Sequence, residues 1–154
     1  MREVKPIGID ILSAFKEVDE EKVDILLKEA LSNLNRKIVV LDDDPTGVQT
    51  VHDISVYTDW ENDSIKSGFE EENSMFFILT NSRGFTVPQT TEVHKTLAQN
   101  IVNVSKELNK DFIVISRGDS TMRGHYPLET EVLKKWDRKT FRNFIWWRNN
   151  NAIL

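Results

Sequence analysis

The sequence predicts an α/β domain with a mainly parallel sheet arranged in three layers. Short apolar runs alternate along the chain with longer stretches in which apolar residues recur at three- and four-residue spacing. The runs are continuously apolar rather than alternating, which is typical of strands buried on both faces of a parallel sheet. Three of the runs end directly in polar clusters that contain Asp, Arg, Ser and Gly. Strands separated by helices of this length indicate βαβ units.

Four strands and three longer helices account for most of this pattern. The strands are expected at residues 37–41, 54–57, 75–80 and 112–116. The helices are expected at residues 19–35, from residue 86 onward, and at residues 127–136. Asp19 and Thr86 suit the position before a first helical turn, and Pro88 is acceptable within one. Residues 60–73 are polar and acidic, so we expect a loop with some helix there rather than core.

The boundaries follow from the same pattern. An N-terminal helical segment, residues 1–36, precedes the α/β domain at residues 37–136, and residues 137–154 form an atypical tail. The tail has two adjacent Trp residues, three consecutive Asn residues and no amphipathic period. One interpretation is an irregular, partly exposed tail. The favoured interpretation is a lost reading frame, because freely chosen codons for residues 136–154, shifted by one base, can spell a strand-like run ending in EIIMPF.

Composition excludes several classes of protein. The 154 residues are enough for one domain with a sizeable core, and 20 basic residues against 25 acidic ones give a net charge of −5. This balance argues against a general nucleic-acid-binding surface. The chain has no Cys, which excludes disulfides, thiolate metal sites and a cysteine nucleophile. No signal peptide core or membrane-spanning apolar run is present, so a soluble, cytoplasmic protein is expected.

The polar clusters that follow three of the strands are the main candidate site. They are DDDPTG at residues 42–47, NSRG at 81–84 and SRGDSTMRGH at 116–125. In a parallel sheet the carboxyl ends of the strands share one edge, where ligands bind. Arginines grip carboxylates in bidentate fashion, and carboxylates accept hydrogen bonds from hydroxyls. The clusters therefore predict a pocket for a small, polyhydroxylated anion.

Simpler structural roles exist for the same residues. An Asp after a strand is often a turn former or helix cap, and Arg83 could form a structural ion pair with an Asp of the first cluster. His125 is better explained as a structural histidine, and His94 has no partner at metal-ligand spacing. No metal site is expected. The chain has neither GxxxxGK[ST] nor GxGxxG, so it is expected to hold a substrate without holding a phosphoryl donor.

Three motifs resemble, in order and spacing, the N-terminal domain of the four-carbon acid sugar kinases. They are VLDDDPTGVQTVHDISVYTDW, FFILTNSRGFT and VISRGDSTMRGHYPLETE, within residues 36–135. The resemblance implies a Rossmann-like domain that holds threonate, erythronate or 3-oxo-tetronate, while a second, C-terminal domain binds ATP. The chain would then be truncated before that nucleotide-binding domain. The EIIMPF run also resembles the segment that comes after these motifs in members of that family.

The resemblance implies specific roles for the matching residues. Asp43 and Asp44 face substrate hydroxyls, and one of them orients or deprotonates the attacking hydroxyl. Thr46 and Gly47 shape the turn, and Arg83 is a partner of the substrate carboxylate. The remaining substrate-binding positions are Ser82, Arg117, Asp119, Ser120, Thr121 and Arg123. Members often have lysine where this chain has Arg117, which keeps the charge but puts its hydrogen bonding in doubt.

The resemblance also sets expectations for cofactors and partners. ATP and Mg²⁺ belong to the second domain, so no cofactor is expected in this chain and it is not expected to act as a kinase alone. The expected partner is a small acidic sugar, with no nucleic acid and no membrane. Edges left exposed by truncation favour self-association, which makes a homo-oligomer a further expectation.

Two other functions remain open from the residues. Asp42, Asp44 and Thr46 fit the DxDx[TV] motif of haloacid-dehalogenase-like phosphatases, with Asp42 as nucleophile, Asp44 as general acid and Mg²⁺ held by the carboxylates. That family also needs a later lysine and an acidic pair, and no convincing pair is found further along the chain. The other alternative is a non-catalytic remnant that binds an acid sugar or nothing.

Overall fold

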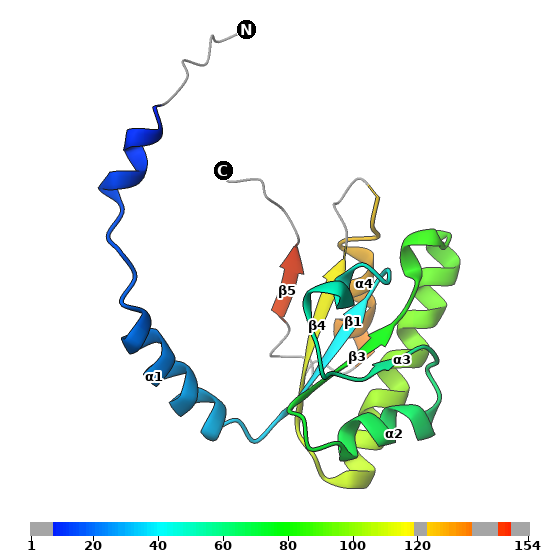
Figure 1. Ribbon diagram of the computed structural model, residues 1–154. Coiled ribbons are helices and arrows are strands. Elements are labelled where there is room, and N and C mark those ends of the chain that lie inside the picture. Colours follow the sequence, from blue (N-terminus) through cyan, green and yellow to red (C-terminus); the bar gives the residue numbers. More distant parts are fainter. Residues whose placement is uncertain (1–7, 119–122, 137–144, 149–154) are drawn as a thin grey trace, which may run out of the picture. The chain divides into compact units, whose positions relative to one another are not determined.

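The computed structural model describes residues 8–118, 123–136 and 145–148 (Figure 1). The chain divides into two compact units, residues 1–34 and residues 35–154. Within the described ranges, no helix is both long enough and apolar enough to cross a bilayer.

The first unit contains a 3₁₀ helix, η1 (Ile9–Ala14), and the helix α1 (Glu20–Ser32). The Asp19 side chain caps α1 by accepting a hydrogen bond of 3.0 Å from the Lys22 backbone N–H. The predicted helix is therefore confirmed, together with its cap. Its apolar side chains are exposed, as Leu26 at 54% shows.

The second unit is built on a five-stranded sheet in the order β2-β3-β1-β4-β5. All neighbouring strands are parallel. This confirms the predicted Rossmann-like α/β class. The strands are β1 (Lys37–Asp42), β2 (Val56–Tyr57), β3 (Met75–Leu79), β4 (Phe112–Gly118) and β5 (Ile145–Arg148). The helices are α2 (Asn62–Glu70), α3 (Val87–Leu108) and α4 (Leu128–Trp136), with short 3₁₀ helices η2 (Gly47–Thr50) and η3 (Ser82–Gly84).

Strand β1 lies between β3 and β4 and is the most buried part of the sheet. Val39, Val40 and Leu41 alternate in direction, yet all three are at most 3% exposed. The continuous apolar run thus reflects burial on both faces, as predicted. Burial continues beyond the apolar run, because Asp42 ends the strand with no exposed surface.

Helices α2, α3 and α4 bury one face of the sheet. Leu97 and Ile101 of α3 and Leu133 of α4 belong to the same core cluster as Val39 and Phe76. The start of α3 is fixed by the predicted cap Thr86, whose backbone N–H donates to the side chain of Gln89 in a capping box. Figure 1 shows α3 running alongside the sheet. This helix connects β3 to β4, which lie on opposite sides of β1.

The stretch at residues 60–73 contains the helix α2, so the expectation of some helix is confirmed, but one side of this helix lies in the core and the expectation that the stretch lies outside the core is wrong. Ile65 and Phe69 of α2 are fully buried. The ring of Phe69 meets Phe76 edge-on, with 5.7 Å between the ring centroids. The polar residues of this stretch face outward, and two apolar residues at i, i+4 spacing suffice to anchor a helix this short.

The tail and strand β2 also differ in detail from the sequence-based expectation. Strand β2 has only two residues, although the Ser55 carbonyl oxygen also accepts a hydrogen bond of 3.0 Å from the Phe77 N–H. Strand β5 lies within residues 137–154, where no regular element was expected, and pairs with the end of β4. Residues 137–144 and 149–154 lie outside the described residues. Whether the native frame is lost in this tail stays a prediction.

Candidate functional site

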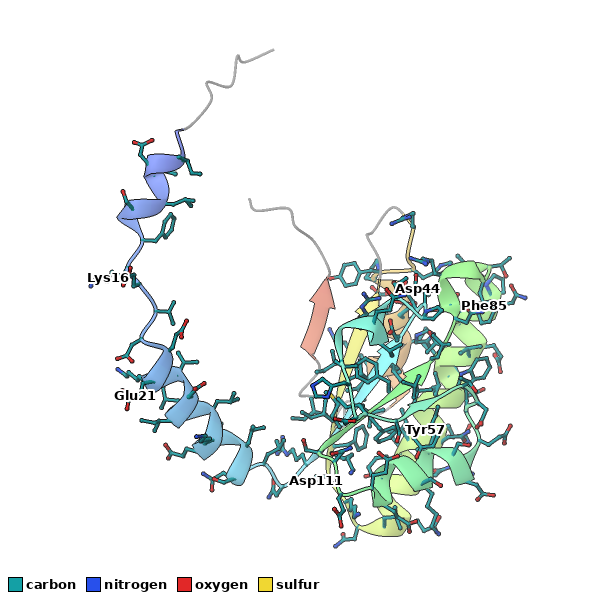
Figure 2. All side chains as sticks on the ribbon, in the orientation of Figure 1. Lys16, Glu21, Asp44, Tyr57, Phe85 and Asp111 are labelled. Atoms are coloured by element: carbon teal, nitrogen blue, oxygen red, sulfur yellow. The ribbon has the colours of Figure 1, made fainter. Side chains whose placement is uncertain are left out.

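The ends of three strands meet at one edge of the sheet. In the register of the ladder, Asp42 lies opposite Leu79 of β3 on one side and Arg117 of β4 on the other. Figure 2 shows Asp44 and Asp111 at opposite ends of this sheet, the carboxyl end of β1 and the start of β4. The predicted convergence of the first two clusters with Arg117 is therefore confirmed.

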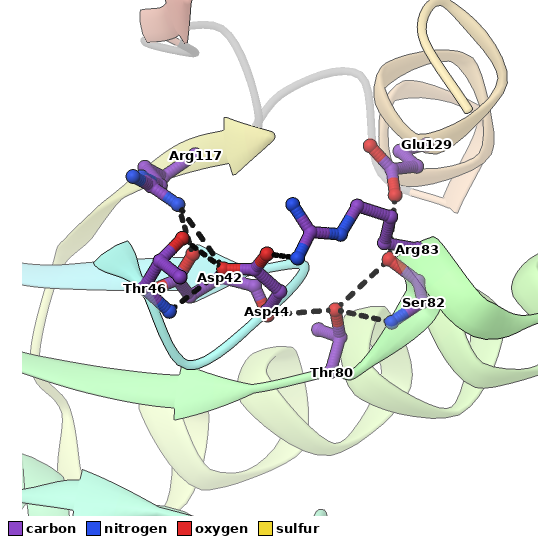
Figure 3. Close-up of polar contacts among 8 residues, drawn as sticks. All are labelled: Asp42, Asp44, Thr46, Thr80, Ser82, Arg83, Arg117 and Glu129. Atoms are coloured by element: carbon purple, nitrogen blue, oxygen red, sulfur yellow. Dashed lines mark hydrogen bonds and ion pairs between the residues drawn. The ribbon is translucent and has the colours of Figure 1, made fainter. Parts of the chain in front are cut away.

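Asp44 is held by contacts on both of its carboxylate oxygens (Figure 3). Oδ1 accepts a hydrogen bond of 2.7 Å from the Thr46 backbone N–H and a second, short one from the Thr46 hydroxyl. Oδ2 forms an ion pair with Nη2 of Arg83. Nη1 of Arg117 lies 3.7 Å from Oδ1. Both the local turn and the structural ion pair weighed from the sequence are thus present, and both fix the Asp44 side chain in place.

Asp42 is enclosed completely and is paired with Arg117. Nη1 of Arg117 donates to Oδ1 of Asp42 at 3.1 Å. Burial nevertheless raises the pKa of Asp42 from 3.8 to about 6, since the Arg117 charge opposes the desolvation only in part. Gly47 lies directly against this carboxylate, because a Cβ atom at residue 47 would overlap Asp42. The predicted role of Gly47 in shaping the turn therefore has a steric basis.

Asp43 joins the ends of β1, β3 and β4 through its backbone. Its N–H donates to the Arg117 carbonyl oxygen at 3.2 Å, and its own carbonyl oxygen accepts from the Arg83 N–H at 3.3 Å. The Asp43 side chain is 3% exposed. Two of the polar clusters are therefore tied to the first by main-chain hydrogen bonds, which hold the site independently of a ligand.

The three carboxylates are close enough to share a cation. One oxygen each from Asp42, Asp43 and Asp44 lies within 4.8 Å of the others, and hard cations prefer such oxygen ligands. The guanidinium groups of Arg83 and Arg117 already contact Asp44 and Asp42. A cation would have to compete with these two groups for the same oxygens.

A buried chain of polar side chains extends from the backbone of Asp42 toward α4. Thr80 Oγ1 lies 2.9 Å from the Asp42 carbonyl oxygen and 3.0 Å from Ser82 Oγ. Ser82 Oγ donates to Oε1 of Glu129 at 2.7 Å (Figure 3). The Nε2 atom of His94 lies 3.9 Å from that same oxygen. The fully buried Ser82 side chain thus links Thr80 to Glu129.

Three members of this chain were missed by sequence reasoning. Glu129 reads as an ordinary acidic residue in the first turn of a helix, and Thr80 reads as the end of a strand. His94 was set aside because it has no partner at a fixed sequence spacing, although its Nδ1 lies 2.9 Å from the Thr90 carbonyl oxygen. A polar residue on an otherwise apolar helix face was the only available signal.

The remaining predicted residues come from the loop after β4. Arg123 is described and exposed, whereas Asp119, Ser120 and Thr121 lie outside the described residues. His125 makes a structural contact, as predicted, because its Nε2 lies 2.9 Å from the Phe85 carbonyl oxygen. The functional roles of all these residues stay predictions.

A comparison of the sequence with models of known protein families identifies the family of the chain. Residues 38–144, more than half of the chain, match the family described as the sugar-binding N-terminal domain. The chain belongs to this family. The match spans all three polar clusters and confirms the resemblance to a sugar-binding N-terminal domain. No curated protein and no solved structure gives a significant match.

Proposed function

We propose that this sugar-binding domain binds a four-carbon acid sugar, of the threonate, erythronate or 3-oxo-tetronate type, at the carboxyl edge of its sheet. One observation carries the proposal. Three buried carboxylates and two arginines are held together at the strand ends of a domain whose family binds sugars. Carboxylates accept hydrogen bonds from hydroxyl groups, and a guanidinium group pairs with an acidic group, so this set matches the chemistry of a small sugar acid.

The exposure of the two arginines assigns them different roles in this proposal. The Arg117 side chain is 14% exposed and lies against Asp42, so it balances buried charge. The Arg83 side chain is 34% exposed, and its guanidinium carries five N–H donors in a planar fork. Arg83 is therefore the partner proposed for the carboxylate of the sugar acid. Asp43 and Asp44 accept hydrogen bonds from the hydroxyl groups of the sugar acid, and one of these two residues orients the hydroxyl that is phosphorylated.

We further propose that the domain is the substrate-binding part of an ATP-dependent kinase and does not turn over ATP by itself. Phosphoryl transfer depends on a positioned donor and on metal ions that bridge its phosphates. The sequence has neither of the two common glycine-rich phosphate loops. ATP and Mg²⁺ are therefore assigned to a second domain, whether on the same chain or on another.

A binding assay with matched ligands and variants tests this function. Thermal unfolding and calorimetric titration would compare D-threonate, D-erythronate and L-threonate with the neutral tetritols threitol and erythritol, and with ATP–Mg²⁺ alone. We expect stabilisation by at least one acid, a smaller effect of the tetritols and none of ATP–Mg²⁺, since a ligand stabilises only the state that binds it.

Arg83→Gln and Arg36→Gln provide a matched pair of variants for the same assay. Both remove one positive charge, but Arg36 precedes the amino end of β1. Arg83→Gln should abolish the preference for the acid over its tetritol, while Arg36→Gln should leave it intact. Equal binding of acids and tetritols by the wild-type chain would overturn the assignment of an acid sugar.

The phosphatase alternative has less support from the geometry. Its nucleophile would be Asp42, which has no exposed surface and is paired with Arg117. A nucleophile must come into contact with the substrate phosphorus, and Asp42 cannot do so without rearrangement of the strand end. Mg²⁺-dependent release of phosphate from p-nitrophenyl phosphate would restore this alternative.

A further inference from the structure

The turn that carries Arg83 is anchored in the interior of the domain. After β3 the chain turns back at Asn81, which has a left-handed φ angle of 54°, and enters η3. Ser82 is buried with no exposed surface, while the side chain of the next residue, Arg83, is 34% exposed. The residue proposed to bind the acidic group of the sugar acid therefore comes directly after a buried anchor.

A closed ring of four hydrogen bonds connects η3 to the first turn of α4. The Phe85 N–H donates to the Ser82 carbonyl oxygen at 3.0 Å. The Phe85 carbonyl oxygen lies 2.9 Å from Nε2 of His125, which donates, because a carbonyl oxygen can only accept. The His125 carbonyl oxygen accepts from the Glu129 N–H at 3.3 Å, and Oε1 of Glu129 accepts from the Ser82 hydroxyl at 2.7 Å. Arg83 lies within the segment that this ring closes.

The side chain of Glu129 is the acceptor that completes this ring. It is 4% exposed and bonds to a residue 47 positions away in the sequence. A buried hydroxyl that loses its acceptor is destabilised, so the turn would have to move to give Ser82 another partner. An oxygen that accepts is all that the ring requires, and a carboxylate, a carboxylic acid and an amide each provide one. The role of Glu129 in the ring therefore does not depend on its charge.

Other contacts hold Arg83 on the side of β1. Its Nη2 forms an ion pair with Asp44, and its backbone N–H donates to the Asp43 carbonyl oxygen at 3.3 Å. A guanidinium group binds a carboxylate best through two parallel N–H donors, so the direction of the group matters as well as its position. Loss of the ring at Ser82 would leave the charge of Arg83 in place but would release the turn from which its side chain extends.

We propose that Glu129 positions Arg83 for the acidic group of the sugar acid, and that it acts through Ser82 (Figure 3). This inference rests on the proposed function and deepens it, because it names a residue outside the three strand-end clusters that supports the binding of an acid. In this role Glu129 does not contact the ligand. It is a positioning residue, which fixes the turn so that the guanidinium group of Arg83 has the direction that a carboxylate requires.

Four substitutions separate the acceptor oxygen of Glu129 from the rest of the side chain. Glu129→Gln keeps an oxygen that can accept from Ser82, whereas Glu129→Met has a similar length and no acceptor oxygen. Ser82→Ala removes the donor of the same hydrogen bond, and it is the second test if Glu129→Met does not fold. Glu131→Met, in the same first turn of α4 and exposed, is the matched control.

The measurement is calorimetric titration with D-threonate and D-erythronate, for each variant alone and in combination with Arg83→Lys. Lysine keeps the positive charge but lacks the planar fork whose direction Glu129 is proposed to fix. We expect the affinity for the better acid to fall at least tenfold in Glu129→Met and in Ser82→Ala, and less than threefold in Glu129→Gln and in Glu131→Met. In the Arg83→Lys background, Glu129→Met should lower the affinity less than threefold. A merely structural role of Glu129 would weaken binding equally in both backgrounds.

The outcomes separate the inference from the function on which it rests. If the wild-type chain binds an acid and Glu129→Met binds it equally well, the positioning role is refuted and the proposed function stands. If Glu129→Gln loses as much affinity as Glu129→Met, or if the loss is the same in the Arg83→Lys background, Glu129 does not act by accepting from Ser82 to position Arg83. If the wild-type chain binds none of the acids, the proposed function fails and the inference fails with it.

Discussion

The ionisation of Asp42 at the end of β1 should change the stability of the domain with pH. Burial raises its pKa to about 6, compared with 3.8 for an ordinary aspartate. The native state therefore holds this proton more tightly than the unfolded chain does, and stability is lost as the pH rises from about 4 to about 6. The two values differ by about two pH units, at about 1.4 kcal/mol each, so the ionised side chain costs about 3 kcal/mol at pH 7.5.

Asp42→Asn removes this titration while it keeps the shape of the side chain. The wild-type cost is about 1 kcal/mol at pH 4.5 and about 3 kcal/mol at pH 7.5 by the same linkage relation. The free energy of unfolding of Asp42→Asn, relative to wild type, should therefore rise by about 2 kcal/mol between these pH values. A constant offset from the altered contact with Arg117 cancels in this difference.

The assay is urea denaturation at both pH values, followed by far-UV circular dichroism. Asp111→Asn is the matched control, because Asp111 is exposed at the opposite end of the sheet (Figure 2). Its stability relative to wild type should change little with pH. A relative stability of Asp42→Asn that stays flat or falls as the pH rises would show that burial does not raise the pKa of Asp42.

Two further predictions concern glycines in the fold. Gly47→Ala should destabilise the domain by about 1–3 kcal/mol in urea denaturation, because the new methyl group overlaps the buried Asp42 carboxylate. Gly84→Ala, which meets no described atom within 4 Å, should change stability by less than about 1 kcal/mol, and equal losses in both variants would contradict the steric explanation. Gly68→Ala should cost a similar 1–3 kcal/mol, roughly, because its Cβ would lie 2.6 Å from the buried ring of Phe76. Recovery of that loss by the double variant Gly68→Ala with Phe76→Leu is expected, and no recovery would place the strain elsewhere.

The parts of the fold that could be predicted are those with a strong local signal. The run at Val39–Leu41 is apolar because β1 is buried on both faces. The Asp residues that follow this run indicate where the carboxyl end of the strand lies. Burial of α2 could not be predicted, because Ile65 and Phe69 are isolated among polar residues and only their partners in β3 and β4 show that they are core. A pattern within one segment cannot report which other segment covers it.

The same limit explains which site residues were found. Asp44, Arg83 and Arg117 each lie at or just after the end of a strand, so a parallel sheet brings them together whatever the helices do. Glu129 reaches the site only because α4 returns across the sheet after a loop, and its neighbour Ser82 comes from a different strand end. No spacing within either segment encodes that contact. Long-range polar contacts between a helix and a loop therefore cannot be predicted from the spacing of residues within either segment.

The balance of charge at the strand end accounts for both the stability and the proposed binding mode. Three carboxylates and two guanidinium groups leave one negative charge in excess, in a place where Asp42 and Asp43 have almost no contact with water. Arg117 forms an ion pair with Asp42, and Arg83 forms an ion pair with Asp44. Hydroxyl donors are the groups that such a region attracts, and an acidic group is repelled from it. A small sugar acid can satisfy both requirements only by turning its carboxylate toward the exposed guanidinium of Arg83 and its hydroxyls toward the carboxylates.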